Sequence, residues 1–277
     1  MTDRYAVFGN PIGHSQSPWI HACFAQQTGQ DICYERQEIP LDGFAAAVWR
    51  FFDEGGSGLN ITVPFKEEAW KLCTLRSPRA QAAGAVNTLQ DLHDGGLYGD
   101  NTDGVGLVRD ITANLRRPLA GARVLLLGAG GAVRGALRPL LEAGPAEITI
   151  ANRTPARAQA LADRIGTRVP VRACGFGDCA GHTFDIVING TSSSLDGDAP
   201  PLPGVLFAAA DSLAYDMVYG GEPTPFMHWA LQQGVTRASD GLGMLVEQAA
   251  ESFYLWRGVR PRSGPVIDAL RLRLTAG

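Results

Sequence analysis

Hydrophobic and polar residues alternate along this chain with two periods, one typical of β-strands and the other typical of α-helices. Residues 4–9 form a short apolar run that ends on glycine. Residues 59–63 alternate apolar with polar positions, as a half-buried strand does. Between these segments, residues 41–52 repeat apolar side chains at helical spacing. The succession of strand, helix and strand predicts an α/β fold with parallel strands.

The second half of the chain repeats this succession after a natural linker at residues 116–121. The most apolar strand predicted, residues 123–127, follows the linker directly. Further strands are predicted at residues 147–151, 184–189 and 215–219. A very apolar strand after a linker that contains proline and glycine indicates a boundary between two α/β domains.

Composition and charge narrow the functional classes. The 277 residues are 45% hydrophobic and 19% charged, which is ordinary for a globular protein. A net charge of -4 without a basic stripe argues against nucleic-acid and anionic-membrane partners. No apolar run approaches membrane-spanning length, and the N-terminus has no signal-peptide core. The five cysteines are odd in number and form no CxxC pair, so we expect no disulfide framework, no metal site and a cytoplasmic location.

Lys66 stands at the start of a predicted helix, directly after a strand that Pro64 should terminate. The helix dipole disfavours an ammonium group at this end, so Lys66 is a candidate proton donor and acceptor near neutral pH. The simpler interpretation is a surface lysine whose aliphatic stem covers the strand end. Residue 66 alone does not distinguish the two.

A second polar segment precedes the helix that should start near Ser17 and Pro18. A hydroxyl residue at the N-cap followed by proline is a helix start signal. Free amides at that helix end, with the hydroxyls of Ser15 and Ser17 beside them, suit a carboxylate or a phosphate. Ser17 could instead only cap its own helix, whereas Ser15 has no such capping role.

Polar residues also gather where two further strands meet the following segments. Asn87 begins a short predicted strand, and residues 99–104 place several polar or turn-forming residues at a strand-to-helix junction. Asp103 could cap the next helix or act as an active-site carboxylate. Gln248 lies beside the apolar stripe of a long helix predicted from about Met244 to Trp256, so its amide needs a side chain or a ligand as partner.

Residues 123–141 read as a strand, a glycine-rich turn and a helix, the context that a dinucleotide-binding fingerprint requires. By strict spacing the third glycine falls on Val133, so the motif is a variant. The next strand ends near Arg153, where NAD-binding units usually carry an acidic residue. Arg153 and Arg157 would instead bind the 2′-phosphate of NADP, although solvated surface arginines are the alternative. Met217 could cover the nicotinamide ring or belong to the core.

Taken in order, these motifs resemble the shikimate dehydrogenase family along nearly the whole chain. Any one of them could arise by chance, but the ordered set is specific. The matching segments are residues 9–18, 62–66, 85–88, 99–104, 128–135, 152–154 and 240–246. Gly13, Gln16 and Val133 differ from the commonest members of the family, at positions that carry no chemistry.

The resemblance implies two α/β domains with the active-site cleft between them. Residues 1–104 and 240–277 would form the substrate-binding domain, and residues 105–239 a Rossmann-type NADP-binding domain. It further implies NADPH-dependent, reversible reduction of 3-dehydroshikimate to shikimate, on the route to chorismate and the aromatic amino acids. A monomer and a homodimer both fit.

The resemblance also assigns roles to individual residues. Lys66 and Asp103 would be the catalytic pair. Substrate would be bound by Ser15, Ser17, Thr62, Asn87, Tyr219 and Gln248. NADP would be bound by Gly128, Ala129, Gly130, Gly131, Ala132, Asn152, Arg153, Thr154, Arg157, Thr191, Met217 and Gly241.

Two other functions remain open. The nearest is a dual quinate/shikimate dehydrogenase, which shares the fold and the catalytic pair. The other is a non-catalytic sensor of NADP or of a metabolite, whose signature would be the loss of Lys66 or Asp103. Folds such as that of methylenetetrahydrofolate dehydrogenase lack both the serine loop and the arginine pair.

Overall fold

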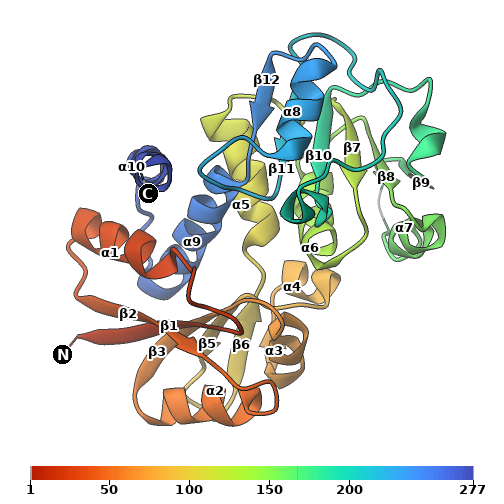
Figure 1. Ribbon diagram of the computed structural model, residues 1–277. Coiled ribbons are helices and arrows are strands. Elements are labelled where there is room, and N and C mark those ends of the chain that lie inside the picture. The colour runs from red at the N-terminus through yellow and green to blue at the C-terminus, as the bar shows by residue number, and fades with distance from the viewer. Residues whose placement is uncertain (1, 167, 277) are drawn as a thin grey trace. The chain divides into compact units, whose positions relative to one another are not determined.

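The computed structural model describes residues 2–166 and 168–276, which divide into two compact units. The first unit runs as far as Gly106 and also includes Val246–Leu270. The second unit comprises Leu107–Leu245 and the residues from Arg271 onward. In Figure 1, the strands of the first unit are red to yellow and those of the second are green to blue, so the chain builds one sheet before the other.

The sheet of the first unit has the strand order β2-β1-β3-β5-β6-β4. Its strands are β1 (Asp3–Gly9), β2 (Ile32–Glu38), β3 (Gly56–Ile61), β4 (Leu75–Arg76), β5 (Thr88–Asp91) and β6 (Leu97–Asp100). β1 runs parallel to β2 and β3, but β5 is antiparallel to both β3 and β6. The parallel arrangement predicted from the first two strand segments is confirmed for β1 and β3, whereas the pairing of β5 makes the whole sheet mixed. The chain between β5 and β6 is too short for a crossover helix, so these strands pair as a hairpin.

Helices α1 (Ser17–Thr28), α2 (Phe44–Asp53), α3 (Lys66–Leu72) and α4 (Pro78–Ala83) belong to the first unit. β3 lies between β1 and β5, and its residues Leu59, Asn60 and Ile61 are all buried. The predicted half-buried strand is thus wrong at this end, because an inner strand of a covered sheet has no solvent face. Asn60 consequently has to find polar partners inside the protein.

The sheet of the second unit is parallel throughout, with the strand order β12-β11-β10-β7-β8-β9. Its strands are β7 (Arg123–Leu127), β8 (Glu147–Ala151), β9 (Val171–Cys174), β10 (Ile186–Asn189), β11 (Leu213–Asp216) and β12 (Arg237–Ser239). In order of appearance this is 3-2-1-4-5-6, the doubly wound order of Rossmann folds, whose ligands bind beyond the carboxyl ends of the first and fourth strands. The predicted Rossmann-type fold is confirmed, and β7 and β10 flank that switch point.

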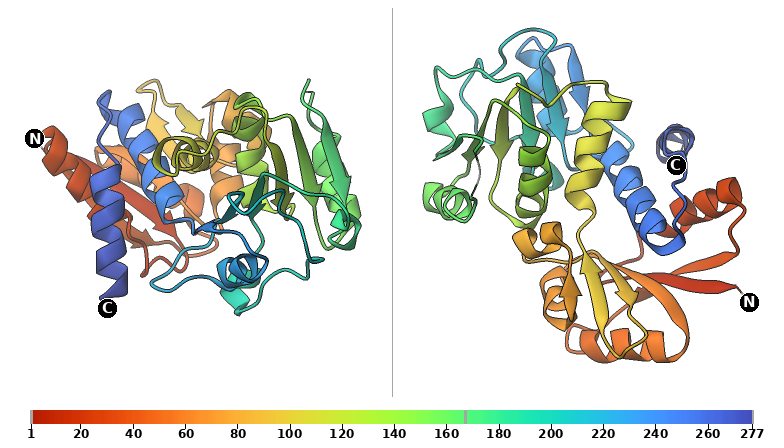
Figure 2. Two further views of the ribbon diagram at one scale, coloured as in Figure 1. Left: turned by 90° about the horizontal axis from the view of Figure 1, so that it is seen from above. Right: turned by 180° about the vertical axis from the view of Figure 1, so that it is seen from behind.

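Two separate cores cover the two faces of this sheet. Val124 and Leu126 of β7 pack in one core, whereas Leu125 and Leu127 pack in the other. Alternation along a strand that is buried on both faces explains the continuous apolar run of β7. The helices of this unit are α6 (Gly131–Glu142), α7 (Pro155–Ala162) and α8 (Pro225–Gln232), and the views of Figure 2 show them beside the green and teal strands.

The remaining helical segments connect or complete the units. They are α5 (Asp103–Arg109), which a π-helical turn η1 (Asp110–Asn114) extends, the 3-10 turns η2 (Gly177–Cys179) and η3 (Ser193–Asp196), and the long helices α9 (Leu242–Arg257) and α10 (Gly264–Thr275). α9 starts two residues before the predicted Met244 and ends one residue after the predicted Trp256. Throughout the described residues, none of these helices has the length and apolarity needed to cross a bilayer.

Candidate active site

Lys66 is presented by a tight turn between β3 and α3. Thr62 donates its backbone N–H to Phe8 at 2.9 Å and accepts the N–H of Phe65 at 3.0 Å, which turns the chain. Phe65 is buried and stacks on Phe44, with ring centroids 4.7 Å apart. This anchored aromatic residue immediately precedes α3, so Lys66 is the first residue of the helix, as the sequence predicts.

The ammonium group of Lys66 forms an ion pair with Asp103. Its Nζ lies 2.6 Å from Oδ2 of Asp103, and the side chains are 28% and 15% exposed respectively. Asn87 donates its Nδ2 to the other carboxylate oxygen at 2.8 Å. α5 starts at Asp103 itself, and both oxygens of this carboxylate are engaged by side chains. The structure therefore brings together the two residues that the sequence indicated for catalysis. The Asp103 carboxylate binds the Lys66 ammonium group.

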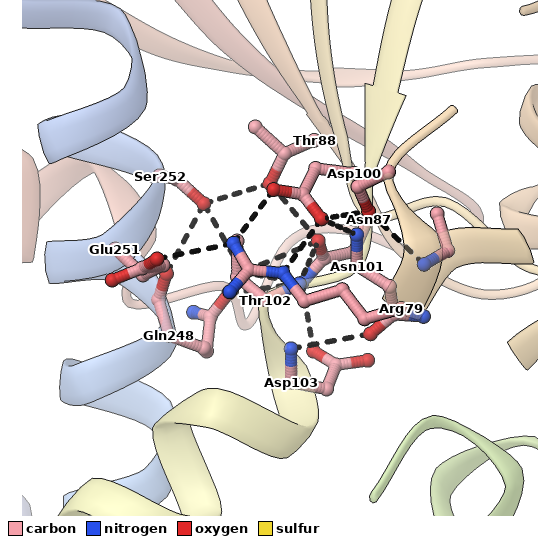
Figure 3. Close-up of polar contacts among 12 residues, drawn as sticks. Arg79, Asn87, Thr88, Asp100, Asn101, Thr102, Asp103, Gln248, Glu251 and Ser252 are labelled. Atoms are coloured by element: carbon pink, nitrogen blue, oxygen red, sulfur yellow. Dashed lines mark hydrogen bonds and ion pairs between the residues drawn. The ribbon is translucent and has the colours of Figure 1, made fainter. Parts of the chain in front are cut away.

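Asn87 connects the predicted substrate residue Gln248 to Thr102 and Asp103, as Figure 3 shows. It is only 3% exposed. Its Nδ2 lies 2.9 Å from Thr102 Oγ1 and 3.3 Å from Gln248 Oε1, and its Oδ1 accepts the backbone N–H of Thr102 at 2.9 Å. The amide of Gln248 thus has side-chain partners in Asn87 and Thr102. The Asn87 amide thus contacts both Asp103 and Gln248, and Asp103 in turn pairs with Lys66.

Four residues of this polar cluster were not singled out from the sequence. Ser252 Oγ lies 2.8 Å from Thr88 Oγ1 and 3.2 Å from Thr102 Oγ1. Asn60 donates its Nδ2 to Ser252 Oγ at 3.1 Å. The position of Ser252 one helical turn after Gln248 is the only signal that the sequence offers, since residues four apart share a helix face. Asn60, Thr88, Thr102 and Ser252 come together only when the sheet and α9 are assembled.

The serine loop differs from its prediction in one respect. α1 begins at Ser17, so the N-cap position falls on Gln16, and Ser15 Oγ accepts the backbone N–H of Ser17 at 3.3 Å. The prediction that Ser17 caps its own helix is therefore wrong, because Ser15 supplies the hydroxyl acceptor. Burial raises the pKa of Tyr34 well above its usual range, and a hydrogen bond with Ser17 opposes this shift. Both serine hydroxyls are thus held at the start of α1.

The glycine-rich turn after β7 forms an open cradle in the second unit. Gly128 has φ +105, and a Cβ there would lie 3.1 Å from the carbonyl oxygen of Gly190. Gly130 is the N-cap of α6 and makes no side-chain cap bond. A Cβ on Gly130 or Gly131 would meet no atom within 4 Å. The start of α6 consequently has open space beside its glycines, and a helix N-terminus of this kind suits a diphosphate.

Val133 stands where the fingerprint normally has its third glycine, yet the close packing of α6 on the sheet is kept. Val133 is fully buried, and its Cγ2 lies 2.6 Å from the position that a Cβ on Gly190 would take. The residue without a side chain at this contact is therefore Gly190, after β10, rather than residue 133 on the helix. The departure of residue 133 from the fingerprint therefore leaves this helix-to-strand contact intact.

Three more predicted cofactor residues lie at the same carboxyl edge. Thr191 donates its backbone N–H and its hydroxyl to Asn189 Oδ1, at 3.1 and 2.7 Å. Met217 follows β11, and its Sδ lies 3.1 Å from the position of a Cβ on Gly190. A Cβ on Gly241 would lie 2.3 Å from the carbonyl oxygen of Met217. Met217 thus lies between the end of β10, where Gly190 and Thr191 follow each other, and Gly241.

The segment after β8 carries the residues predicted to bind the 2′-phosphate. α7 begins at Pro155 with Thr154 at the N-cap, as predicted, although the Thr154 side chain makes no cap bond. Asn152 Nδ2 donates to the carbonyl oxygen of Thr154 at 2.9 Å, which holds the turn. Arg153 and Arg157 are exposed. Two available guanidinium groups beside a helix N-terminus suit a dianionic phosphate, so these residues and the glycine cradle fit NADP.

Two predicted substrate residues have less support from the structure. Tyr219 belongs to the second unit, where burial raises the pKa of its phenol and Asp240 adds to the shift. Thr62 lies in the turn before Lys66, with its Cγ2 2.5 Å from the position of a Cβ on Gly9. The substrate roles of Tyr219 and Thr62 stay predictions.

Comparison with known protein families gives a consistent result over most of the chain. Residues 7–89 match the shikimate dehydrogenase substrate binding domain. Residues 110–196 match the model described as shikimate / quinate 5-dehydrogenase. Residues 241–271 match the shikimate 5′-dehydrogenase C-terminal domain.

Individual relatives resemble the chain from end to end. The NADP(+) shikimate dehydrogenase of Alkalilimnicola ehrlichii is 61% identical, over 98% of this chain and 99% of the relative. The crystal structure of an Ael1 enzyme from Pseudomonas putida is 51% identical with a TM-score of 0.91, covering 97% of this chain and 98% of that one. Shikimate 5-dehydrogenase of Thermus thermophilus, solved with NADP(H) and shikimate, is 35% identical with a TM-score of 0.86, covering 99% of this chain and 100% of that one.

Proposed function

The chain belongs to the shikimate dehydrogenase family, and we propose that it catalyses the NADP-dependent, reversible reduction of 3-dehydroshikimate to shikimate. The observation that carries this proposal is the ion pair of Lys66 and Asp103 inside a network of polar side chains. A lysine and a carboxylate held together in this way can move a proton at a reacting hydroxyl group. The reaction serves the route to chorismate and the aromatic amino acids.

The relatives support the activity and the cofactor. The family and function predicted from the sequence are confirmed by relatives that are NADP(+) shikimate dehydrogenases. The structure from Thermus thermophilus contains both NADP(H) and shikimate. The glycine cradle, the N-terminus of α6 and the exposed pair Arg153 and Arg157 support the same cofactor from this chain's own residues.

All but one of the residues proposed for substrate recognition belong to the first unit. Ser15 and Ser17, at the start of α1, bind the substrate carboxylate together with the helix amides. Asn87 and Gln248 bind ring hydroxyl groups, since their amides offer both donors and acceptors. Thr62 contributes from the turn before Lys66, and Tyr219 contributes from the second unit. Because the Asn87 amide is already held by Thr102 and Asp103, little ordering is needed when substrate binds.

Proton transfer is the task of Lys66. When bound, NADPH would supply the hydride for the reduction, and NADP+ would accept it in the oxidation. The Lys66 ammonium group donates a proton to the substrate oxygen during reduction, and the free amine takes that proton back during oxidation. Asp103 keeps Nζ within 2.6 Å and so fixes where the proton is delivered.

The cofactor is held by the second unit. The backbone and small residues from Gly128 to Ala132 would hold the diphosphate, since a Cβ on Gly130 or Gly131 would point into open space. Arg153 and Arg157 bind the 2′-phosphate with Asn152 and Thr154 beside them. Thr191, Met217 and Gly241 line the nicotinamide end. This division explains why the acidic residue typical of NAD-binding units is missing after β8.

A dual quinate/shikimate dehydrogenase is the second candidate, since the family model that matches residues 110–196 is described by both substrates. Initial rates of NADP+ and NAD+ reduction with shikimate and with quinate test the assignment. We expect kcat/KM to be highest for shikimate with NADP+. Comparable values with quinate would favour the dual enzyme, and binding of NADP+ without any turnover would favour a sensor. The cytoplasmic location and a monomeric or homodimeric state form part of the proposal, and light scattering tests the latter.

A further inference from the structure

Arg79 joins three segments that surround the candidate active site, although it is neither a catalytic nor a substrate residue. It lies on α4, and Figure 3 shows its guanidinium group between Asp100 and the helix that carries Glu251. Its Nε donates to Asp100 Oδ1 at 2.7 Å and its Nη2 to Asp100 Oδ2 at 2.6 Å. The same Nη2 lies 3.0 Å from Glu251 Oε1. The contact with Asp100 is bidentate, which fixes the orientation of both groups.

Asp100 transmits this constraint to the backbone that carries the catalytic carboxylate. It ends β6 and is 1% exposed. Its Oδ1 accepts the hydroxyl of Ser77 and the backbone N–H of Asn101, the latter at 2.7 Å. Asn101 in turn accepts the backbone N–H of Asp103 at 3.2 Å. Two successive side chains therefore hold the short segment that presents Thr102 and Asp103.

Glu251 is the second ion-pair partner of Arg79. It is 8% exposed and lies three residues after Gln248 on α9, about one helical turn away. Its other oxygen pairs with Arg260, so the carboxylate is held from both sides. Arg79 thus connects the helix that carries Gln248 to the segment that carries Thr102. These are the two residues that also meet at Asn87.

The positive charge of Arg79 balances the two carboxylates of Asp100 and Glu251. Burial opposes the charged guanidinium, but Asp100 and Glu251 outweigh this effect and raise the pKa of Arg79 above its usual value. Without the guanidinium, Asp100 would be a buried carboxylate that had lost its only ion-pair partner among the described residues. The turn that depends on Asp100 would then rearrange.

We propose that Arg79 is a positioning residue for the reaction, which sets Thr102 and Asp103 through Asp100 and the Gln248 helix through Glu251. This inference rests on the proposed function. A lysine cannot replace Arg79 fully, because an ammonium group lacks the planar fork that engages both oxygens of Asp100. Loss of Arg79 should therefore lower kcat/KM for shikimate and leave the KM for NADP+ unchanged.

The test compares Arg79→Met, Arg79→Lys and Arg76→Met with the full-length parent enzyme. Arg76 is a matched control, since it is also half-buried but donates to the Trp70 carbonyl and stacks on the Trp70 ring. For Arg79→Met we expect kcat/KM for shikimate to fall ~10- to 100-fold, the scale of a small misplacement of catalytic groups. The KM for NADP+ should stay within about 2-fold. Arg79→Lys should recover part of the loss, and Arg76→Met should show none.

Amide hydrogen exchange gives a second readout that needs no turnover. In Arg79→Met, the amides of Asn101, Thr102 and Asp103 should exchange at least about 10-fold faster, while those of β7 stay unchanged. Unchanged exchange at these amides, or a KM for NADP+ that rises as much as that for shikimate, would overturn the proposal. A parent enzyme that does not turn over shikimate would refute the proposed function, whereas the exchange result would still decide the role of Arg79.

Discussion

The substrate side of the first unit and the cofactor side of the second are built on opposite principles. Around Asn87, polar side chains fill the site and satisfy one another, and the Lys66–Asp103 pair is one member of that network. Around Gly128 and Gly190, the candidate cofactor site depends on glycines, because a side chain at either position would collide with its neighbours. The first arrangement specifies where protons and hydroxyl groups go, and the second leaves room for a large anion.

This difference predicts two kinds of sensitivity. In the polar network, removing one group leaves a buried partner without its hydrogen bond or its counter-charge, which is costly. In the glycine cradle, adding one carbon produces a collision, because interiors are close-packed. Substitutions in the first region should therefore affect chemistry or shikimate binding. Substitutions in the second should affect stability or the cofactor.

The largest effect is expected for Lys66→Met, which removes the proton donor and keeps the aliphatic stem. We expect kcat to fall ~100-fold or more, the scale of general acid–base catalysis. Steady-state kinetics with shikimate and NADP+ measure the loss, and Lys71→Met on the same helix is the control, because Lys71 is exposed. If kcat were kept and only the KM for shikimate rose, Lys66 would be a binding residue.

The double substitution Arg153→Ala and Arg157→Ala tests the cofactor side. We expect the KM for NADP+ to rise about 30-fold, since charge-assisted hydrogen bonds to the 2′-phosphate are lost. The KM for NAD+ and that for shikimate should change little. Arg164→Ala, an exposed arginine just beyond α7, is the control. An equal rise in KM for NADP+ and NAD+ would show that the two arginines do not recognise the 2′-phosphate.

Acid should destabilise the first unit through His21, which is fully buried and stacks on Tyr34 with centroids 4.1 Å apart. Burial lowers the pKa of His21 from 6.5 to about 3, while a contact with Asn60 opposes the shift. Because the folded-state pKa lies below the unfolded-state pKa, the stabilising contribution is complete above pH 6.5 and declines as the pH falls toward 3. We expect a loss of about 2 kcal/mol between about pH 7 and pH 5.

Denaturant unfolding across this pH range measures the effect of His21. His21→Phe keeps an aromatic ring in the stack and should flatten the dependence, whereas the exposed His182→Gln should not. A dependence that survives in His21→Phe would assign the acid sensitivity to another group.

The smallest effect is expected for Gly190→Ala, whose new methyl group would lie 2.6 Å from Val133 Cγ2. We expect a loss of about 1 kcal/mol in the free energy of unfolding, because the β-branched Val133 cannot move aside easily. Gly130→Ala, in the same cradle but facing open space, should cost less. In a double-mutant cycle with Val133→Ala, favourable coupling would assign the cost to this contact, and additive losses would refute it.

Much of the fold and of the site could be predicted from local signals. The run from Arg123 to Leu127 predicts a strand buried on both faces, since nearly every residue is apolar. The turn at Pro64 and the start of α3 at Lys66 follow from proline chemistry and helix periodicity. The residue that accepts an N–H at the start of α1 could not be predicted from the sequence. Ser15 and Ser17 carry the same hydroxyl group, and only the backbone path decides which of them is the acceptor.

By itself, the sequence determined the family and the Rossmann-type fold of the second unit, and it indicated Lys66 and Asp103, because short motifs in a fixed order along the chain carry this information. Only the tertiary structure decided that β5 and β6 form a hairpin within a mixed sheet, and that Ser252 and Asn60 belong to the network of Asn87. It also decided that Gly190 compensates for Val133, and that Arg79 holds Asp100 and Glu251. Those contacts join residues far apart in sequence, whose meeting depends on strand order and helix placement rather than on any local pattern.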